Sequence, residues 1–109
     1  MEQRAVGIRV TVTRSGGFAG LTQPPYELDS ADLSSEDAEE LERRVAAADF
    51  FELPSIVPAA AAAPDAFQYD VTVESGGRHH TVRAGDVSAP EALLDLVEHV
   101  MSAARADRS

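Results

Sequence analysis

The sequence predicts an α+β fold: a four-stranded, mostly antiparallel sheet with two helices on one face. Two stretches, about 5–13 and 67–84, alternate apolar and polar residues with the period of a strand, and a glycine pair interrupts the second. Two others, about 35–48 and 91–104, repeat apolar residues at helical steps. With a short extra strand the order is ββαββα, and most connections are too short for parallel crossovers.

The first strand is expected over about 5–13 and leads into a loop of small residues. The strand places Val6, Ile8, Val10 and Val12 on one face. The alternation then stops at an octapeptide with three glycines and one aromatic residue: Arg14, Ser15, Gly16, Gly17, Phe18, Ala19, Gly20 and Leu21. Phe18 has no evident core to enter, so we interpret this loop as a partner-binding segment held out by the sheet. A plain structural turn is the alternative, and a phosphate loop is disfavoured because no helix start follows.

The middle of the chain is expected to hold a short strand, a helix and a loop. After two prolines, Tyr26–Asp29 is predicted as the second strand. Ser34-Ser35-Glu36-Asp37 is predicted to open a helix with a serine N-cap, and this helix is expected to end near residues 48–49. Its inward stripe is Ala38, Leu41, Val45 and Ala48. The stretch 55–64, which contains Ala59 to Ala63, is expected to be a flexible loop because five alanines are too few to nucleate a helix.

The last third is expected to be a hairpin followed by a helix. The turn is predicted at Ser75-Gly76-Gly77-Arg78. Ser88 and Glu91 fit a capping box for a helix that ends at about residue 104 or 105. We expect the uncovered sheet face to carry Arg9, Thr11, Thr72, Thr81 and Arg83.

Composition limits the classes of function. A chain of 109 residues predicts one domain, 1–109. The net charge of −10 disfavours nucleic acid as a partner, and no apolar run is long enough to cross a membrane. The absence of cysteine excludes disulfides and thiolate metal sites. We expect a cytoplasmic monomer without a cofactor.

The sequence also argues against an enzyme. It contains no zinc-protease helix motif, Walker loop or nucleophile elbow. His79 and His80 are neighbours on a strand, so their rings should point to opposite faces and not share a metal. His99 is expected on the outer side of the second helix beside Glu98. No catalytic or metal-ligating residues are therefore assigned, and the carboxylates of 29–42 are interpreted as a solvated helix face.

Five stretches of the chain together match the pattern of a known family: the glycine octapeptide 14–21, Phe50-Phe51-Glu52-Leu53-Pro54, Pro64-Asp65, the strand 67–73 and the helix start at 88–91. Through them the chain resembles the emfourin family of proteinaceous inhibitors of thermolysin-like (protealysin-type) zinc metalloproteases. The family resemblance implies a tight, reversible inhibitor without catalysis or cofactor. By that analogy the loop enters or blocks the protease cleft, with Phe18 or Leu21 as an apolar anchor and Arg14 pairing with cleft carboxylates. A carbonyl near Gly16 or Gly17 approaches the zinc in the same analogy.

A second function class stays open from the sequence. The chain is also compatible with a non-catalytic interaction module, such as an accessory subunit, that uses the exposed sheet face or the acidic helix. A Phe18→Ala substitution separates the two, because only the first depends on the loop.

Overall fold

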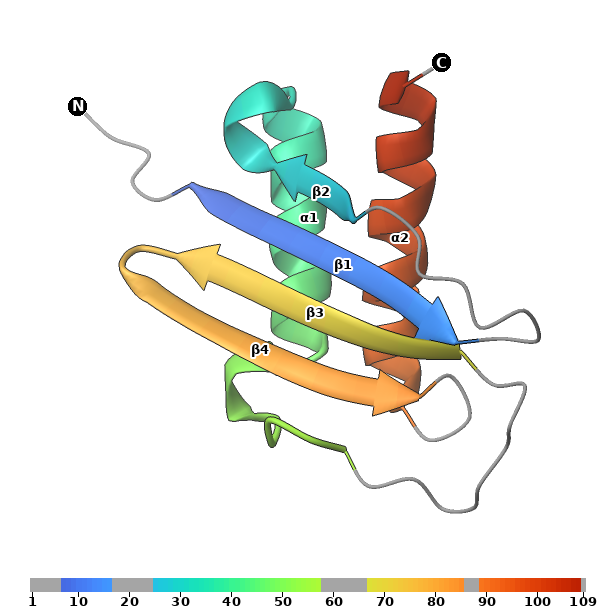
Figure 1. Ribbon diagram of the computed structural model, residues 1–109. Coiled ribbons are helices and arrows are strands. Elements are labelled where there is room, and N and C mark those ends of the chain that lie inside the picture. Colours follow the sequence, from blue (N-terminus) through green and yellow to red (C-terminus); the bar gives the residue numbers. More distant parts are fainter. Residues whose placement is uncertain (1–6, 17–24, 58–66, 86–88, 109) are drawn as a thin grey trace.

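Four strands form one sheet in the order β2-β1-β3-β4, and every neighbouring pair is antiparallel (Figure 1). The computed structural model of the chain describes residues 7–16, 25–57, 67–85 and 89–108. The strands are β1 (Ile8–Gly16), β2 (Tyr26–Asp29), β3 (Phe67–Ser75) and β4 (Arg78–Gly85). The two central strands, β1 and β3, pair along nine residues each, so they form the stiffest part of the sheet.

Two helices, α1 (Ser35–Ala47) and α2 (Glu91–Arg108), cover one face of this sheet, and within the described residues no helix lies over the other face (Figure 1). Two single 3-10 turns, η1 (Ser30–Asp32) and η2 (Phe50–Glu52), lead into and out of α1. The α+β fold class, the ββαββα order and the two-layer arrangement are therefore confirmed.

The first helix begins and ends where local chemistry requires. The Ser34 hydroxyl accepts a hydrogen bond from the Asp37 amide at 3.1 Å, as expected for an N-cap. At the other end Asp49 has a left-handed backbone with a φ of 53°, which stops the helix and turns the chain into η2. The predicted inward stripe is buried at all four positions: Ala38, Leu41, Val45 and Ala48.

The core lies between the sheet and the two helices. The sheet contributes branched side chains with no exposed surface: Val10, Val12, Val71, Val73 and Val82. The helices contribute Leu41, Leu93, Leu96, Val97 and Val100, and η2 contributes Phe50. Branched residues on the strands and leucines on the helices are typical of two-layer packing, since each fits the surface of its own element.

Three element boundaries differ from the sequence expectation. β1 continues to Gly16 and does not end at Thr13, because it pairs with β3 as far as Gly16 opposite Phe67. α2 continues to Arg108, one turn beyond the predicted end. Residues 55–57 are not simply loop, because Ile56 forms a parallel bridge to Arg83 of β4. The predicted cap Ser88 and the alanine run 59–63 lie outside the described residues.

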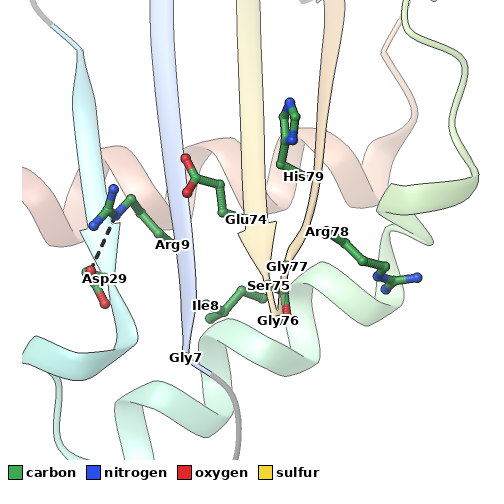
Figure 2. A pocket seen from close by; sticks show the side chains of 10 residues that line it. All are labelled: Gly7, Ile8, Arg9, Asp29, Glu74, Ser75, Gly76, Gly77, Arg78 and His79. Carbon is green, nitrogen blue, oxygen red and sulfur yellow. Dashed lines mark hydrogen bonds and ion pairs between the residues drawn. The ribbon is translucent and has the colours of Figure 1, made fainter.

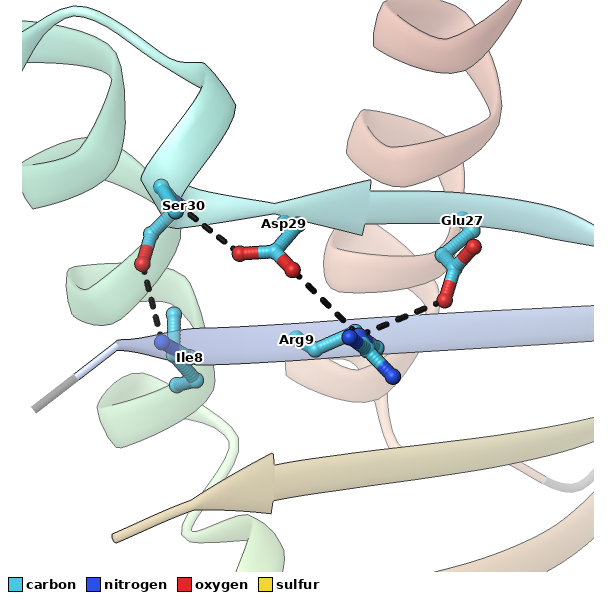
Figure 3. A network of polar contacts seen from close by, with 6 residues as sticks. Ile8, Arg9, Glu27, Asp29 and Ser30 are labelled. Atoms are coloured by element: carbon cyan, nitrogen blue, oxygen red, sulfur yellow. Dashed lines mark hydrogen bonds and ion pairs between the residues drawn. The ribbon is translucent and has the colours of Figure 1, made fainter.

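A polar network joins the start of β1 to the end of β2 (Figure 3). The Ser30 hydroxyl accepts a hydrogen bond from the Ile8 amide at 2.8 Å, and Arg9 Nε lies 3.3 Å from Asp29 Oδ2 and 3.4 Å from Glu27 Oε2. The hydrogen bond to Asp29, followed by the charge of Glu27, raises the pKa of Arg9 above its ordinary value. The short edge strand β2 is thereby held in register on β1 by side chains as well as by its ladder.

Candidate partner-binding site

The proposed partner-binding segment, Arg14–Leu21, begins inside the sheet. Its first three residues are the last three of β1 and lie opposite β3: Arg14 faces Tyr69, Ser15 faces Gln68 and Gly16 faces Phe67. The sequence suggested that this segment is a loop from its first residue, and that prediction was wrong. Pairing with β3 extends β1 beyond the alternating residues as far as Gly16. Gly17, Phe18, Ala19, Gly20 and Leu21 lie outside the described residues.

Within the described residues, the end of β1 pairs with β3 on one side and has no strand beside it on the other. β2 starts at Tyr26, opposite Val12, so the last four residues of β1 extend beyond it and pair with β3. These residues form the base from which the glycine segment departs. Because that base is part of a nine-residue ladder, the first residues of the segment have fixed directions before any partner arrives.

Arg14 lies at this base, half-buried on the helix-bearing face. It follows Val10 and Val12 at two-residue steps, and side chains at that spacing share a face. Arg14 also interacts with other residues of the chain. The Arg14 side chain is therefore held by contacts within the chain at the start of the segment. The sequence alone suggested a side chain within an exposed loop.

Three strand ends lie together at the end of the sheet where the glycine segment begins: the end of β1, the start of β3 and the end of β4. Gly16 lies opposite Phe67, and the next residue of β3, Gln68, lies opposite Gly85 at the end of β4. The tight turn at Gly76 and Gly77 lies at the opposite end of the same strands. Three strand ends are therefore neighbours at this end of the sheet, whereas a compact hairpin joins β3 to β4 at the other end.

The uncovered sheet face carries ordered rows of polar side chains. One row holds Asp29, Arg9, Glu74 and His79, which alternate acidic and basic residues across the four strands. In the next row the hydroxyls of Thr72 and Thr81 lie 2.8 Å apart. A third places Arg83 Nε 2.8 Å from Asp70 Oδ1, and this hydrogen bond raises the pKa of Arg83. The residues predicted for the uncovered face are therefore found together there, and their side chains pair with one another or with neighbouring carboxylates on the same face.

A depression of about 540 Å³ lies at the hairpin end of this face (Figure 2). Polar and charged side chains from all four strands line it, among them Asp29, Arg9, Glu74 and His79, together with the two turn glycines. Across the described ranges, no three histidine or carboxylate side chains gather as they would around a metal ion. The depression is a broad polar hollow without a converging donor set.

The two neighbouring histidines have separate environments, as the strand alternation predicted. His80 points to the helix side, where its Nε2 lies 2.7 Å from the carbonyl oxygen of Leu53 and its ring meets Phe50 edge-on at 5.6 Å. His79 is exposed in the row with Glu74. The two rings share neither a face nor a ligand.

Sequence analysis missed the contact of residues 55–57 with β4. The Arg83 amide donates to the Ser55 carbonyl at 2.7 Å, and the Val57 amide donates to the Arg83 carbonyl at 2.9 Å. The available signal was the pair Ile56-Val57 before Pro58, since branched residues favour extended backbone. In the part of the chain that the structure describes, no helix is both long and apolar enough to cross a bilayer.

Comparison with known proteins identifies the family. No match was found among curated proteins or among solved structures. The family model described as Emfourin matches residues 12–101, a span that starts in β1, contains the whole glycine segment and ends in α2. Because this match covers most of the chain, the protein belongs to the emfourin family, and that membership indicates a protease inhibitor.

Proposed function

We propose that this chain is a reversible inhibitor of thermolysin-like zinc metalloproteases, and that residues Arg14–Leu21 occupy or block the protease cleft. The observation that carries the proposal is the family match over residues 12–101, which includes this segment. The proposed inhibitor acts in the cytoplasm as a monomer and performs no chemistry of its own.

The sheet supports this role through the rigidity of the segment's base. A loop that enters a cleft loses conformational freedom, and each side chain that becomes ordered costs about 0.5–1.5 kcal/mol. The ladder between β1 and β3 already fixes Arg14, Ser15 and Gly16 in the free protein. Part of the ordering cost is therefore met by folding, and this favours tight association.

Within the segment, we assign the apolar contact to Phe18 or Leu21. A large apolar side chain in a desolvated pocket is the usual centre of an interface. Arg14, at the base, is suited to pair with carboxylates at the rim of the cleft. The carbonyl of Gly16 or Gly17 is the group that approaches the zinc in this arrangement, and a complex with an undisturbed zinc-bound water would contradict that detail.

The proposal is tested by titrating the purified chain against thermolysin with a peptide substrate. Wild-type protein should inhibit, and Phe18→Ala should weaken inhibition by about 2 kcal/mol, since the anchor is lost. Ile56→Ala is the matched control, because Ile56 is an exposed apolar residue outside the segment, with 67% of its surface accessible. It should inhibit as wild type does. Absence of inhibition by the wild-type chain, or full inhibition by both Phe18→Ala and Leu21→Ala, would contradict the proposal.

The uncovered sheet face supports the second candidate, an interaction module. This face spans four strands and carries the polar rows described above. Thr11 lies near its centre, between Glu27 and Thr72, so Thr11→Arg places a large charge in any interface there. Loss of inhibition with Thr11→Arg but not with Phe18→Ala would favour this candidate over the loop.

A further inference from the structure

Where β1 and β4 end and β3 begins, the sheet presents a last row of residues on each of its two faces. The row on the helix side is Arg14, Tyr69 and Ala84. The row on the uncovered face is Ser15, Gln68 and Gly85. Asp70, two residues after Gln68 on β3, accepts a hydrogen bond from Arg83 on the uncovered face, so the alternation of the strand places the Gln68 side chain on that face too.

At this end of β3, only the uncovered face offers an accessible side chain. On the helix side, Tyr69 and its neighbour Ala84 have 8% and 2% of their surfaces exposed. Gln68 is exposed, and within the described residues no helix lies over its face (Figure 1). A partner that contacts this end of the central strands therefore meets Gln68 and not the core residues behind it.

Gln68 also lies beside the base of the glycine segment. It is directly opposite Ser15 in the ladder, and the Cβ atoms of directly opposite residues are about 4.5–5.5 Å apart. Its neighbour on the other side is Gly85, which has no side chain and so permits the close approach of another backbone. A protein that receives the glycine segment is thereby brought within reach of the Gln68 side chain.

The side-chain amide of Gln68 is available for binding. It offers two N–H donors and one carbonyl acceptor, and within the described residues it has no hydrogen-bond partner. The polar groups in the next rows are paired with each other, Asp70 with Arg83 and Thr72 with Thr81. A paired group must give up its partner before it binds another, whereas the Gln68 amide only exchanges water for a new partner.

We propose that Gln68 is a second contact between the inhibitor and its protease, in which the side-chain amide hydrogen-bonds to a polar group at the rim of the cleft. This inference rests on the proposed function, because it takes the glycine segment as the part that enters the cleft. The surface that meets the protease then continues from Arg14–Leu21 onto the uncovered face at Gln68 and Gly85, and not onto the helix side.

The test measures inhibition of thermolysin by single variants with a peptide substrate. Gln68→Ala should weaken inhibition about fivefold, the effect of one lost hydrogen bond, mainly through faster dissociation. Its urea midpoint should equal that of wild type, because the side chain is exposed and holds no other residue. Gln68→Val should weaken inhibition equally, and it replaces Gln68→Ala if that variant folds poorly, because branched residues favour a strand.

Glu74→Ala is the matched control, because Glu74 lies on the same strand and the same face, at the hairpin end of the sheet. It should inhibit as wild type does. Absence of inhibition by the wild-type chain contradicts the proposed function and the Gln68 contact with it. If Phe18→Ala or Leu21→Ala weakens inhibition and both Gln68 variants do not, the proposed function stands and the Gln68 contact is overturned. Equal losses in Gln68→Ala and Glu74→Ala also overturn it, because the effect is then not confined to the end of the sheet beside the glycine segment.

Discussion

His99 is half-buried where α2 packs on α1. Burial, followed by the charge of Arg44, lowers the pKa of the His99 imidazole below its ordinary value of 6.5, and Glu40 and Asp37 offset only part of this. The unfolded chain therefore takes up a proton at His99 at a higher pH than the folded chain does. Between the two pKa values the unfolded state binds more protons, so acid in that window destabilises the fold.

We expect the free energy of unfolding to fall as the pH drops below 6.5, and to fall less in His99→Gln. Urea unfolding of both proteins between about pH 8 and pH 5 measures the contribution of neutral His99 to stability. This contribution is fully present above pH 6.5 and is lost below the pKa of His99 in the folded state. Hydrogen bonding to Arg43 lowers the pKa of Glu40 below 4.5, so its own titration lies below this range. Parallel pH profiles for the two proteins would show that His99 is not coupled to folding.

The position of His99 was predicted wrongly, and the reason is geometric. On α2 this residue lies three positions after Leu96 and four before Ala103, at the border of the buried stripe. A helical period shows which side of a helix is apolar, but not which border a second helix covers. Placing His99 against α1 requires the angle between the two helices, which the sequence does not contain.

The hairpin between β3 and β4 shows how two glycines set an element. Gly76 and Gly77 have φ angles of 57° and 83°, both in the left-handed region, as a two-residue type I′ turn requires. This turn twists in the same sense as the strands, and it fixes the register in which Ser75 faces Arg78. The register in turn brings every core residue of β4 to the helix side.

We expect Gly77→Ala to lower the free energy of unfolding by about 1 kcal/mol, because an L-residue strains at this φ. A Cβ at Gly77 has no heavy atom within 4 Å, so no steric clash contributes. Gly76→Asn is the control, since asparagine followed by glycine is favoured in type I′ turns, and it should unfold at the urea concentration of wild type. Equal midpoints for all three proteins would mean that the turn does not limit stability.

Local sequence patterns predicted those elements whose structure is determined by residues close together in the sequence. The alternation of residues 67–84, the serine cap at 34–35 and the turn glycines each specify a structure within a few residues, and each is confirmed. The end of β1 and the bridge at Ile56 were missed for one shared reason. Both depend on pairing with a strand more than twenty residues away, which no local pattern encodes.

At the scale of the whole molecule, the sequence predicted the two layers but not the continuation of β1 into the base of the candidate site. Apolar periodicity determines which faces are buried, and this is sufficient to place two helices on one side of a sheet. A partner-binding segment is not stabilised by its own core, so its side chains leave no periodic signal. Phe18 was singled out because it breaks the pattern, and its role stays a prediction that the inhibition assay decides.

Charge also acts on the molecule as a whole. The chain carries 19 acidic and 9 basic residues, and α1 concentrates five carboxylates over seven positions. Glu40 is the favourable member of this group, since it forms ion pairs with Arg43 and Arg44, the latter with Arg44 Nε at 2.8 Å. Glu42 lies three residues after Glu39 on the same helix, a spacing that makes the two carboxylates neighbours that repel each other.

We therefore expect repulsion to dominate, so that added salt raises the urea midpoint of the wild-type chain as it screens the excess negative charge. Glu42→Gln should raise the free energy of unfolding by about 0.3 kcal/mol in low salt, and the gain should shrink in about 0.5 M sodium chloride. Glu40→Gln is the matched control and should lower stability, because Arg43 and Arg44 lose their partner. If salt lowers the wild-type midpoint, attractive pairs such as those of Arg9 and Arg83 outweigh the net charge, and the acidic surface then contributes to solubility without opposing the fold.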